Sequence, residues 1–307
     1  MRVITSASNL QAGGRKVSLA IGFFDGVHLG HQQIIRQTVT DAGQHGAIPL
    51  VVTFDAHPNT VVAPERVPPL IQTLAQRQRA IAEIGIEALL LIHFDRPFSQ
   101  QTGEEFIRGL ARDFGSINSV CVGANFGFGH KRSGDVNLLK RLGAELRFAV
   151  HGLAAVSLDG QRVSSTRIRE VILSGDFDAA SQMLGRAYAL AGKVVRGDEL
   201  GRQLGLPTAN LEVAGLALPP RGVYAAIAET NQGRFQAVLN LGLRPTLKNP
   251  APQLRVEAHL LDFEGDLYGK EIEISFVERL RDEQKFASLD ELRAQINRDI
   301  LTARTRF

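Results

Sequence analysis

The sequence predicts an α/β domain built on a parallel sheet, followed by an antiparallel β-barrel and a C-terminal helix. In the first half, apolar strand-like runs alternate with amphipathic helix-like segments, which is the pattern of β-α-β units. Towards the C-terminus, short strand-like runs are separated by Gly, Pro and Asn turns. Because 307 residues are too many for one ordinary core, we expect two domains, residues 1–184 and 185–307.

The first domain is expected to alternate strands and helices. Apolar runs predict strands at residues 17–21, 48–54, 88–92 and 119–123. Helical spacing predicts a first helix, and further helices at 74–84 and 102–114. The residues that indicate the first helix are Ile34, Ile35, Thr38, Val39 and Ala42. Thr102, with Glu105 three residues later, has the pattern of a capping box at a helix start.

The second domain is expected to pair short strands. These are predicted at residues 194–196, 223–229, 235–241, 256–261 and 272–277, with a hairpin turn at residues 231–233. Ser288 and Glu291 predict a second capping box. The helix that follows has Leu292, Ile296 and Ile300 on one side, so we expect it to lie against the barrel.

Composition narrows the class of protein. The net charge is only +3, and basic residues alternate with acidic ones, so phosphorylated small molecules are better candidate partners than nucleic acid. The one cysteine, Cys121, lies in an apolar run and excludes a disulfide framework. Neither a signal-peptide pattern nor a membrane-length apolar stretch occurs. We therefore expect a cytoplasmic enzyme that binds no membrane.

The segment from Gly22 to Gln32 reads GFFDGVHLGHQ and connects a predicted strand to a predicted helix. Free backbone N–H groups and the positive end of the helix dipole favour an anion at such a junction. His28 and His31 are three residues apart and can add donors or charge where a reacting phosphate would lie. Taken alone, an HxxH pattern is also compatible with an ordinary tight turn.

A second candidate phosphate site is the serine-rich turn Ser164, Ser165, Thr166 and Arg167, which enters another helix. Hydroxyl groups, fresh helix N–H groups and an arginine together form an anion nest. From the residues alone, an ordinary N-cap is an equally open interpretation.

The second domain has no GxxxxGK[ST] motif, which excludes a P-loop kinase. Its glycine-rich segment 197–210 ends in Pro207, Thr208, Ala209 and Asn210. Thr208 and Asn210 alternate along an extended chain and can present two neutral oxygens on one face, which suits Mg²⁺. Glu257, in a predicted strand, could accept a proton from a hydroxyl group, or could simply face the solvent.

Six ordered segments carry a resemblance to a known family, and the resemblance runs from about residue 15 to the C-terminus. They are GFFDGVHLGH at 22–31, TFDAHP at 53–58, GANFGFG at 123–129, SSTRIR at 164–169, GLPTANL at 205–211 and VEAHLLDF at 256–263. The chain resembles the prokaryotic bifunctional riboflavin kinase and FMN adenylyltransferase family, also called FAD synthetases. Three positions differ from the frequent family residues, namely Phe23, Ala56 and Asn125.

The resemblance implies a Rossmann-like nucleotidyltransferase domain that adenylylates FMN to FAD with release of pyrophosphate. It implies that His28 and His31 contact the ATP phosphates, with Ser164, Ser165, Thr166 and Arg167 as a second phosphate motif. Other residues implied to bind ATP or FMN are Gly22, Phe24, Asp25, Gly26, His57 and Asn125.

For the barrel, the resemblance implies ATP-dependent phosphorylation of riboflavin to FMN. Thr208 and Asn210 would hold Mg²⁺, and Glu257 would be the base that accepts the ribityl hydroxyl proton. ATP would bind at Gly197, Gly201, Arg202, Gly205 and Pro207. Flavin contacts are implied for Arg244, Thr246, Arg281 and Phe286.

Our interpretation is therefore a bifunctional enzyme that uses ATP and Mg²⁺ at both sites. Two alternatives stay open. One is a nucleotidyltransferase with another acceptor, such as pantetheine phosphate or nicotinamide mononucleotide, which the pairing of the PTAN segment with Glu257 disfavours. The other is a flavin-binding regulator with decayed sites, which the presence of His28, His31, Thr208, Asn210 and Glu257 disfavours.

Overall fold

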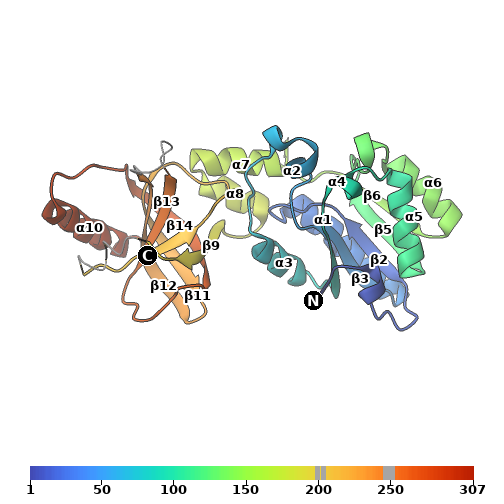
Figure 1. The fold of residues 1–307 in the computed structure, drawn as a ribbon, viewed down its shortest axis with the longest axis horizontal. Coiled ribbons are helices and arrows are strands. Elements are labelled where there is room, and N and C mark those ends of the chain that lie inside the picture. Colours follow the sequence, from blue (N-terminus) through green and yellow to red (C-terminus); the bar gives the residue numbers. More distant parts are fainter. Residues whose placement is uncertain (198–200, 202–204, 245–252) are drawn as a thin grey trace. The chain divides into compact units, whose positions relative to one another are not determined.

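The computed structural model (Figure 1) describes residues 1–197, 201, 205–244 and 253–307, the side chains of residues 243, 244 and 253 excepted. The chain forms two compact units. The first comprises Met1–Leu70 and Leu74–Arg167, and the second comprises Ile71–Thr73 and Ile168–Phe307. In the described ranges, no helix combines the length and apolarity that crossing a membrane requires.

The first unit contains a six-stranded sheet in the order β1-β4-β3-β2-β5-β6, and every pair in it is parallel. The four predicted strands are present, and β1 and β6 extend the sheet at its edges, where half-exposed residues gave no clear apolar run. The strands are β1 (Arg2–Ile4), β2 (Val17–Ile21), β3 (Ile48–Phe54), β4 (Ala88–Ile92), β5 (Ile117–Gly123) and β6 (Ala149–Leu153).

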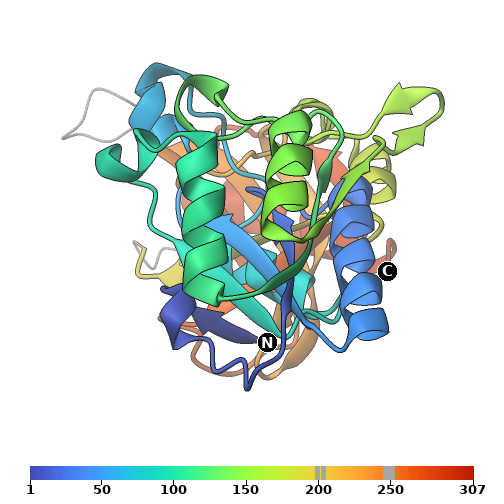
Figure 2. The ribbon, with the colours of Figure 1, turned by 90° about the vertical axis from the view of Figure 1, so that its right-hand side faces the viewer.

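Helices cover both faces of this sheet. Leu19 and Leu50 face the side covered by α5 (Gly103–Phe114) and α6 (Val136–Leu146). Ala20 and Val51, one residue further along each strand, face α1 (Leu29–His45) and α3 (Leu74–Ala82). Figure 2 shows α5 and α6 in front of the sheet. The alternation follows from the two-residue period of a strand.

Shorter elements complete the first unit. They are the helices α2 (Asn59–Val62) and α4 (Arg96–Ser99), the 3-10 turns Ala7–Asn9, Pro64–Arg66 and His130–Arg132, and the hairpin of β7 (Ser157–Leu158) and β8 (Gln161–Arg162). The predicted capping box of α5 is confirmed: Thr102 accepts from the Glu105 N–H, and Glu105 accepts from the Thr102 N–H.

The second unit is built on a closed barrel in the order β10-β13-β12-β11-β14-β9. Its strands are β9 (Ala189–Val195), β10 (Ala209–Glu212), β11 (Gly222–Thr230), β12 (Gly233–Arg244), β13 (Gln253–Leu260) and β14 (Glu271–Arg281). Thr230 pairs with Gly233, which confirms the predicted hairpin. Apolar residues such as Leu211, Leu239 and Val256 fill the interior.

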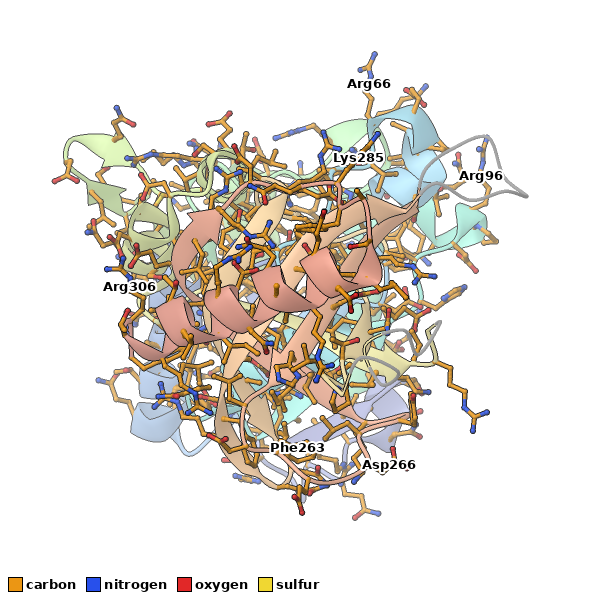
Figure 3. All side chains as sticks on the ribbon, turned by 90° about the vertical axis from the view of Figure 1, so that its left-hand side faces the viewer. Arg66, Arg96, Phe263, Asp266, Lys285 and Arg306 are labelled. Carbon is orange, nitrogen blue, oxygen red and sulfur yellow. The ribbon has the colours of Figure 1, made fainter. Side chains whose placement is uncertain are left out.

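Helix α10 (Leu289–Arg304) lies against the outside of the barrel (Figure 3), as predicted. Its residues Ile300 and Ala303 pack on strand residues. One detail of its cap was wrong. Ser288 accepts from the Glu291 N–H, but the Glu291 carboxylate accepts from the Ala287 N–H instead of that of Ser288. The reciprocal half of the capping box is therefore displaced by one residue.

Two helices precede the barrel strands in the chain, α7 (Ser165–Ser174) and α8 (Phe177–Leu184). Phe177, in α8, packs on the barrel core: its ring lies 4.5 Å from that of Phe276 and 6.1 Å from that of Tyr188. The residues of α8 therefore contribute to the second compact unit.

Candidate functional site

The carboxyl ends of β2, β3 and β5 lie at one edge of the sheet, because adjacent parallel strands end on the same side. The segments that follow these strands carry three of the predicted site groups, namely His28 after β2, His57 after β3 and Asn125 after β5. The parallel order of the sheet thus brings sequence-distant motifs to a single edge.

His28 and His31 form one stacked pair at the start of α1. Their ring centroids are 3.6 Å apart with an interplanar angle of 19°. His28 is the N-cap of the helix, and its Nδ1 accepts the His31 N–H at 3.3 Å. Nδ1 of His31 is buried without a partner, and burial, His28 and Arg77 together hold the pKa of His31 well below its usual value. His31 is therefore a neutral imidazole with an unused nitrogen in the first turn of α1.

The turn between β2 and α1 has an unusual backbone. Phe24, Gly26 and Val27 have φ values of +58°, +83° and +39°. The Phe24 ring folds back over Gly22, where an added Cβ would lie 2.9 Å from its Cζ, and its edge meets the His31 ring at 5.3 Å. Gly22 is thus required for packing within the turn. Its predicted approach to a nucleotide stays a prediction.

The second phosphate motif meets this turn. Ser165, the first residue of α7, donates its hydroxyl hydrogen to the backbone oxygen of Asp25 at 2.9 Å. Ser164 Oγ accepts the Arg167 N–H at 3.3 Å, which is an ordinary capping contact, and Thr166 is exposed. The starts of α1 and α7 therefore lie close to the same buried Asp25.

His57 and Asn125 occupy different surroundings at the sheet edge. Nδ1 of His57 accepts the Asn59 N–H at 3.1 Å, and its ring meets Phe23 edge-on at 4.9 Å. Asn125 is exposed and lines a hollow of about 860 Å³ together with Arg132 and Lys140.

An aromatic cavity of about 660 Å³ adjoins the Gly22–Phe23 turn. Besides Phe23, six phenylalanines of its lining form a chain of ring contacts in which neighbouring centroids are 5.1 to 6.2 Å apart. None of the six was predicted from the sequence as a site residue. They are Phe54, Phe94, Phe98, Phe106, Phe126 and Phe128. His130, Lys131 and Arg132 add basic groups to the lining. Such a cavity suits a flat ring that carries an anionic group.

In the barrel, Asn210 on β10 and Asn240 on β12 both lie directly opposite Glu257 on β13. Their neighbours Ala209 and Val256 point into the barrel core, so this row of three polar residues is on the outer face. Glu257 is partly exposed, and its Oε1 lies 3.5 Å from Nη1 of Arg255. The predicted base and one predicted metal ligand are therefore neighbours.

The glycine-rich segment lies against the PTAN residues. A Cβ on Gly197 would come within 2.4 Å of the Asn210 carboxamide, and one on Gly201 within 3.2 Å of Thr208 Oγ1. Gly205 has a φ of +76°, and Pro207 accepts a hydrogen bond on its carbonyl from the ring of His259 at 2.7 Å. Arg202 lies outside the described residues.

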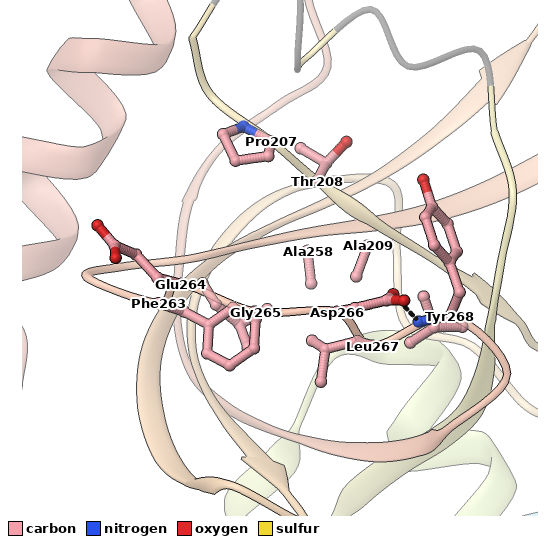
Figure 4. Close-up of a pocket in the computed structure, with 12 residues that line it drawn as sticks. Pro207, Thr208, Ala209, Ala258, Phe263, Glu264, Gly265, Asp266, Leu267 and Tyr268 are labelled. Carbon is pink, nitrogen blue, oxygen red and sulfur yellow. Dashed lines mark hydrogen bonds between the residues drawn. The ribbon is translucent and has the colours of Figure 1, made fainter.

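A pocket of about 320 Å³ opens beside Pro207 and Thr208 (Figure 4). Its far side is the loop from Phe263 to Tyr268, none of whose residues was predicted from the sequence as a site residue. Within that loop, Asp266 accepts the Tyr268 N–H at 2.8 Å. The signal that could have identified this loop is that it begins at Phe263, the last residue of the VEAHLLDF segment.

The predicted flavin contacts of the barrel remain predictions. The Arg281 guanidinium makes three hydrogen bonds to the buried Asp299 carboxylate of α10, and it lies 5.9 Å from the Phe286 ring centroid. The Arg244 side chain and all of Thr246 lie outside the described part of the chain.

Comparisons with known proteins cover the whole chain. The family model for FAD synthetase matches residues 11–167, and that for riboflavin kinase matches residues 184–307. Proteins named bifunctional riboflavin kinase/FMN adenylyltransferase from Escherichia coli K12, Pseudomonas fluorescens and Haemophilus influenzae are 38%, 36% and 33% identical. Those alignments cover 100%, 99% and 100% of this chain, and 98%, 97% and 99% of the relatives.

A solved structure from Streptococcus pneumoniae, described as a macrolide-efflux protein, aligns with a TM-score of 0.80 and 29% identity over 98% of each chain. The chain belongs to the family of bifunctional riboflavin kinases and FMN adenylyltransferases.

Proposed function

We propose that this chain phosphorylates riboflavin to FMN in the barrel and adenylylates FMN to FAD in the α/β unit, with ATP as the co-substrate of both reactions. The full-length similarity to bifunctional relatives supports both activities. The observation that carries the proposal is that each unit has its own polar site: the stacked histidines in the first and the Asn210–Glu257–Asn240 row in the second.

In the adenylyltransferase reaction, a phosphate oxygen of FMN attacks the α-phosphorus of ATP, and pyrophosphate leaves. The protein mainly positions two anions and stabilises developing charge, so no side-chain nucleophile is needed. His28, His31 and the start of α7 would hold the ATP phosphates. The aromatic cavity would accept the isoalloxazine ring, with the basic residues of its lining toward the phosphate end.

In the kinase reaction, the ribityl hydroxyl of riboflavin attacks the γ-phosphorus of ATP, and ADP leaves. Glu257 would accept the hydroxyl proton, since its carboxylate is partly exposed on the outer face. The pocket beside Pro207 and Thr208 would hold part of the nucleotide.

We propose Mg²⁺ as the metal of both reactions. In the described ranges no group of three or more His, Cys, Asp or Glu residues could hold a metal ion. The Thr208 hydroxyl and the Asn210 carboxamide supply hard oxygen ligands, which fit an ion that keeps its waters and takes most other ligands from substrate phosphates. When bound, Mg²⁺ would neutralise phosphate charge. A cytoplasmic location stays a prediction from the sequence.

The test is to incubate the purified chain with riboflavin, ATP and MgCl₂ and to separate the flavins chromatographically. Formation of both FMN and FAD is expected. FMN alone would favour a nucleotidyltransferase domain that uses another acceptor, and neither product would favour the regulator alternative.

A further inference from the structure

Arg77 is a deeply buried arginine on α3, and only 4% of its surface is exposed. Arginine is seldom buried to this degree without an acidic partner. Asp25 and Asp55 act electrostatically on its guanidinium and raise its pKa, against the larger lowering caused by burial. Its Nε is buried and makes no hydrogen bond. A charge buried to this degree must be held by specific polar contacts.

The guanidinium joins the ends of two strands. Nη1 donates to the backbone oxygen of Phe23 at 2.8 Å, and Nη2 donates to that of Phe54 at 2.6 Å. The Gly22 N–H donates to the Val52 oxygen, so the backbone pairing of β2 with β3 continues one residue beyond β2. Past that point, Arg77 links the two segments through the Phe23 and Phe54 oxygens. Arg77 therefore holds the start of the turn between β2 and α1 against the end of β3.

The same guanidinium also orients a ring. Its Cζ lies 4.4 Å from the centroid of Phe23, whose ring meets His57 edge-on. Phe23 and Phe54, the two residues whose carbonyls it binds, both line the aromatic cavity. The Arg77 side chain thus contacts both the backbone of the turn between β2 and α1 and the wall of the aromatic cavity.

Arg77 also carries its charge at neutral pH. Burial lowers its pKa to about 10, which still leaves the group protonated at pH 7. In a site shielded from water, a fixed positive charge acts strongly on nearby groups. One such group is His31, because the positive charge of Arg77 helps to lower the pKa of its imidazole.

We propose that Arg77 is a positioning residue for adenylyl transfer, which rests on the proposed function. Its guanidinium fixes the carbonyl and the ring of Phe23 and the end of β3. The turn between β2 and α1 and the aromatic cavity therefore keep one relative geometry. It also places a permanent positive charge beside the stacked histidines, where anionic substrates react.

The test uses the full-length variant Arg77→Met, which keeps the aliphatic stem and removes the charge and both hydrogen bonds. The kcat for FAD formation from FMN should fall about 10-fold to 100-fold. Riboflavin phosphorylation by the same molecules should not change. Arg79→Met, which alters an exposed arginine of the same helix, is the matched control and should leave both activities at the wild-type level.

A pH profile separates this role from a purely structural one. Removal of a positive charge near His31 raises the pKa of that histidine, so the acid limb of FAD formation should move to higher pH in Arg77→Met. Arg77→Lys keeps the charge but cannot bridge both carbonyls, so it should lower kcat while leaving the acid limb in place.

Wild-type FAD formation by a folded Arg77→Met variant would overturn the inference. If that variant does not fold, Arg77→Lys takes its place, and an unchanged kcat in Arg77→Lys would overturn it equally. A wild-type chain that makes no FAD from FMN would instead overturn the proposed function, because the comparison among arginine variants presupposes that activity.

Discussion

At the scale of single residues, the stacked histidines combine the capping of a helix with a proposed place in the phosphate site. His28 caps α1 through its Nδ1, so this nitrogen is occupied in the helix start. His31 keeps a buried nitrogen without a partner. If both belong to the phosphate site, His28 contributes mainly through its other ring nitrogen and through the orientation of His31.

His28→Ala or His31→Ala should lower FAD formation by about 30-fold to 1000-fold, because each would remove a proposed contact to phosphate in the transition state. FMN formation should stay near the wild-type rate, since the kinase site lies in the other unit. Flavin chromatography of both reactions measures this. His45→Ala, at the other end of α1, is the control, and full FAD synthesis in either site variant would disprove the phosphate role.

The lowered pKa of His31 predicts a pH dependence of stability. In the unfolded chain a histidine takes up a proton near pH 6.5, whereas the folded site resists this. The unfolded state then binds more protons, so the free energy of unfolding should fall as the pH drops below about 6.5. Melting curves from pH 8 to 5 should show a smaller acid loss for His31→Gln than for wild type, and equal losses would contradict the assignment.

In the barrel, the predicted base can be tested with little change in shape. Glu257→Gln should suppress riboflavin phosphorylation and preserve flavin binding, because the amide is nearly isosteric but cannot accept the proton. Asn210→Ala should raise the Mg²⁺ concentration needed as well as lower the rate. Glu229→Gln, an exposed strand residue, serves as control, and unchanged kinase turnover in Glu257→Gln would return Glu257 to a structural role.

What the sequence could predict at this scale depended on chain locality. His28, His31 and Asp25 lie within one short motif, and the strand and helix on either side of it have clear periodicity. Arg77 could not be found in this way. It lies in a helix rich in Gln and Arg, where an exposed arginine is the ordinary expectation, and its burial arises only when α3 packs beneath the ends of β2 and β3.

At the scale of elements, the strands buried on both faces were the most predictable, because their apolar runs are continuous. The edge strands β1 and β6 lack such runs, and β10 is a short strand within the PTAN segment. The aromatic cavity is lined by residues from several elements, so no pattern within one stretch of the sequence predicts it.

The ion pair between Arg281 and Asp299 links helix α10 to the barrel and is more buried than the pair between Arg304 and Asp262. The side chains of Arg281 and Asp299 are 17% and 6% exposed, whereas those of Arg304 and Asp262 are 43% and 74% exposed. Removing one partner of a buried pair leaves an uncompensated charge, which costs about 3 kcal/mol or more. An exposed pair adds little net stability, because water and salt screen the two charges.

Arg281→Met should therefore lower the midpoint of denaturant unfolding of the second unit clearly more than Arg304→Met does. Asp299→Asn in the Arg281→Met background should recover part of the loss, since it removes the orphaned carboxylate. If Arg281→Met costs no more than Arg304→Met, Arg281 does not anchor the helix. Unchanged stability with weakened riboflavin binding would instead support the predicted flavin contact.

At the scale of the whole molecule, three divisions of the chain can be compared. The compact units divide at residues 167 and 168, within α7, while the family models end at residue 167 and resume at 184. The boundary predicted from sequence is 184 to 185, where the periodicity changes. These positions differ by which helices accompany the barrel.

The packing of α8 predicts which boundary yields the better kinase fragment. Phe177 stacks on Phe276 and Tyr188, and Ser181 Oγ accepts the Tyr188 N–H at 3.0 Å. A fragment of residues 185–307 loses both contacts and exposes the aromatic rings that Phe177 covers. A fragment of residues 168–307 keeps them.

We expect both fragments to phosphorylate riboflavin, because Thr208, Asn210 and Glu257 lie in the barrel in each case. The longer fragment should melt several degrees higher, since the loss of a packed Phe side chain costs about 3 kcal/mol. Phe177→Ala in the longer fragment should reproduce most of the difference, whereas Asp178→Ala, next to it on α8, should not. Equal melting temperatures for the two fragments would show that α8 adds nothing to the barrel, and a folded longer fragment without kinase activity would show that the kinase site requires residues of the first unit.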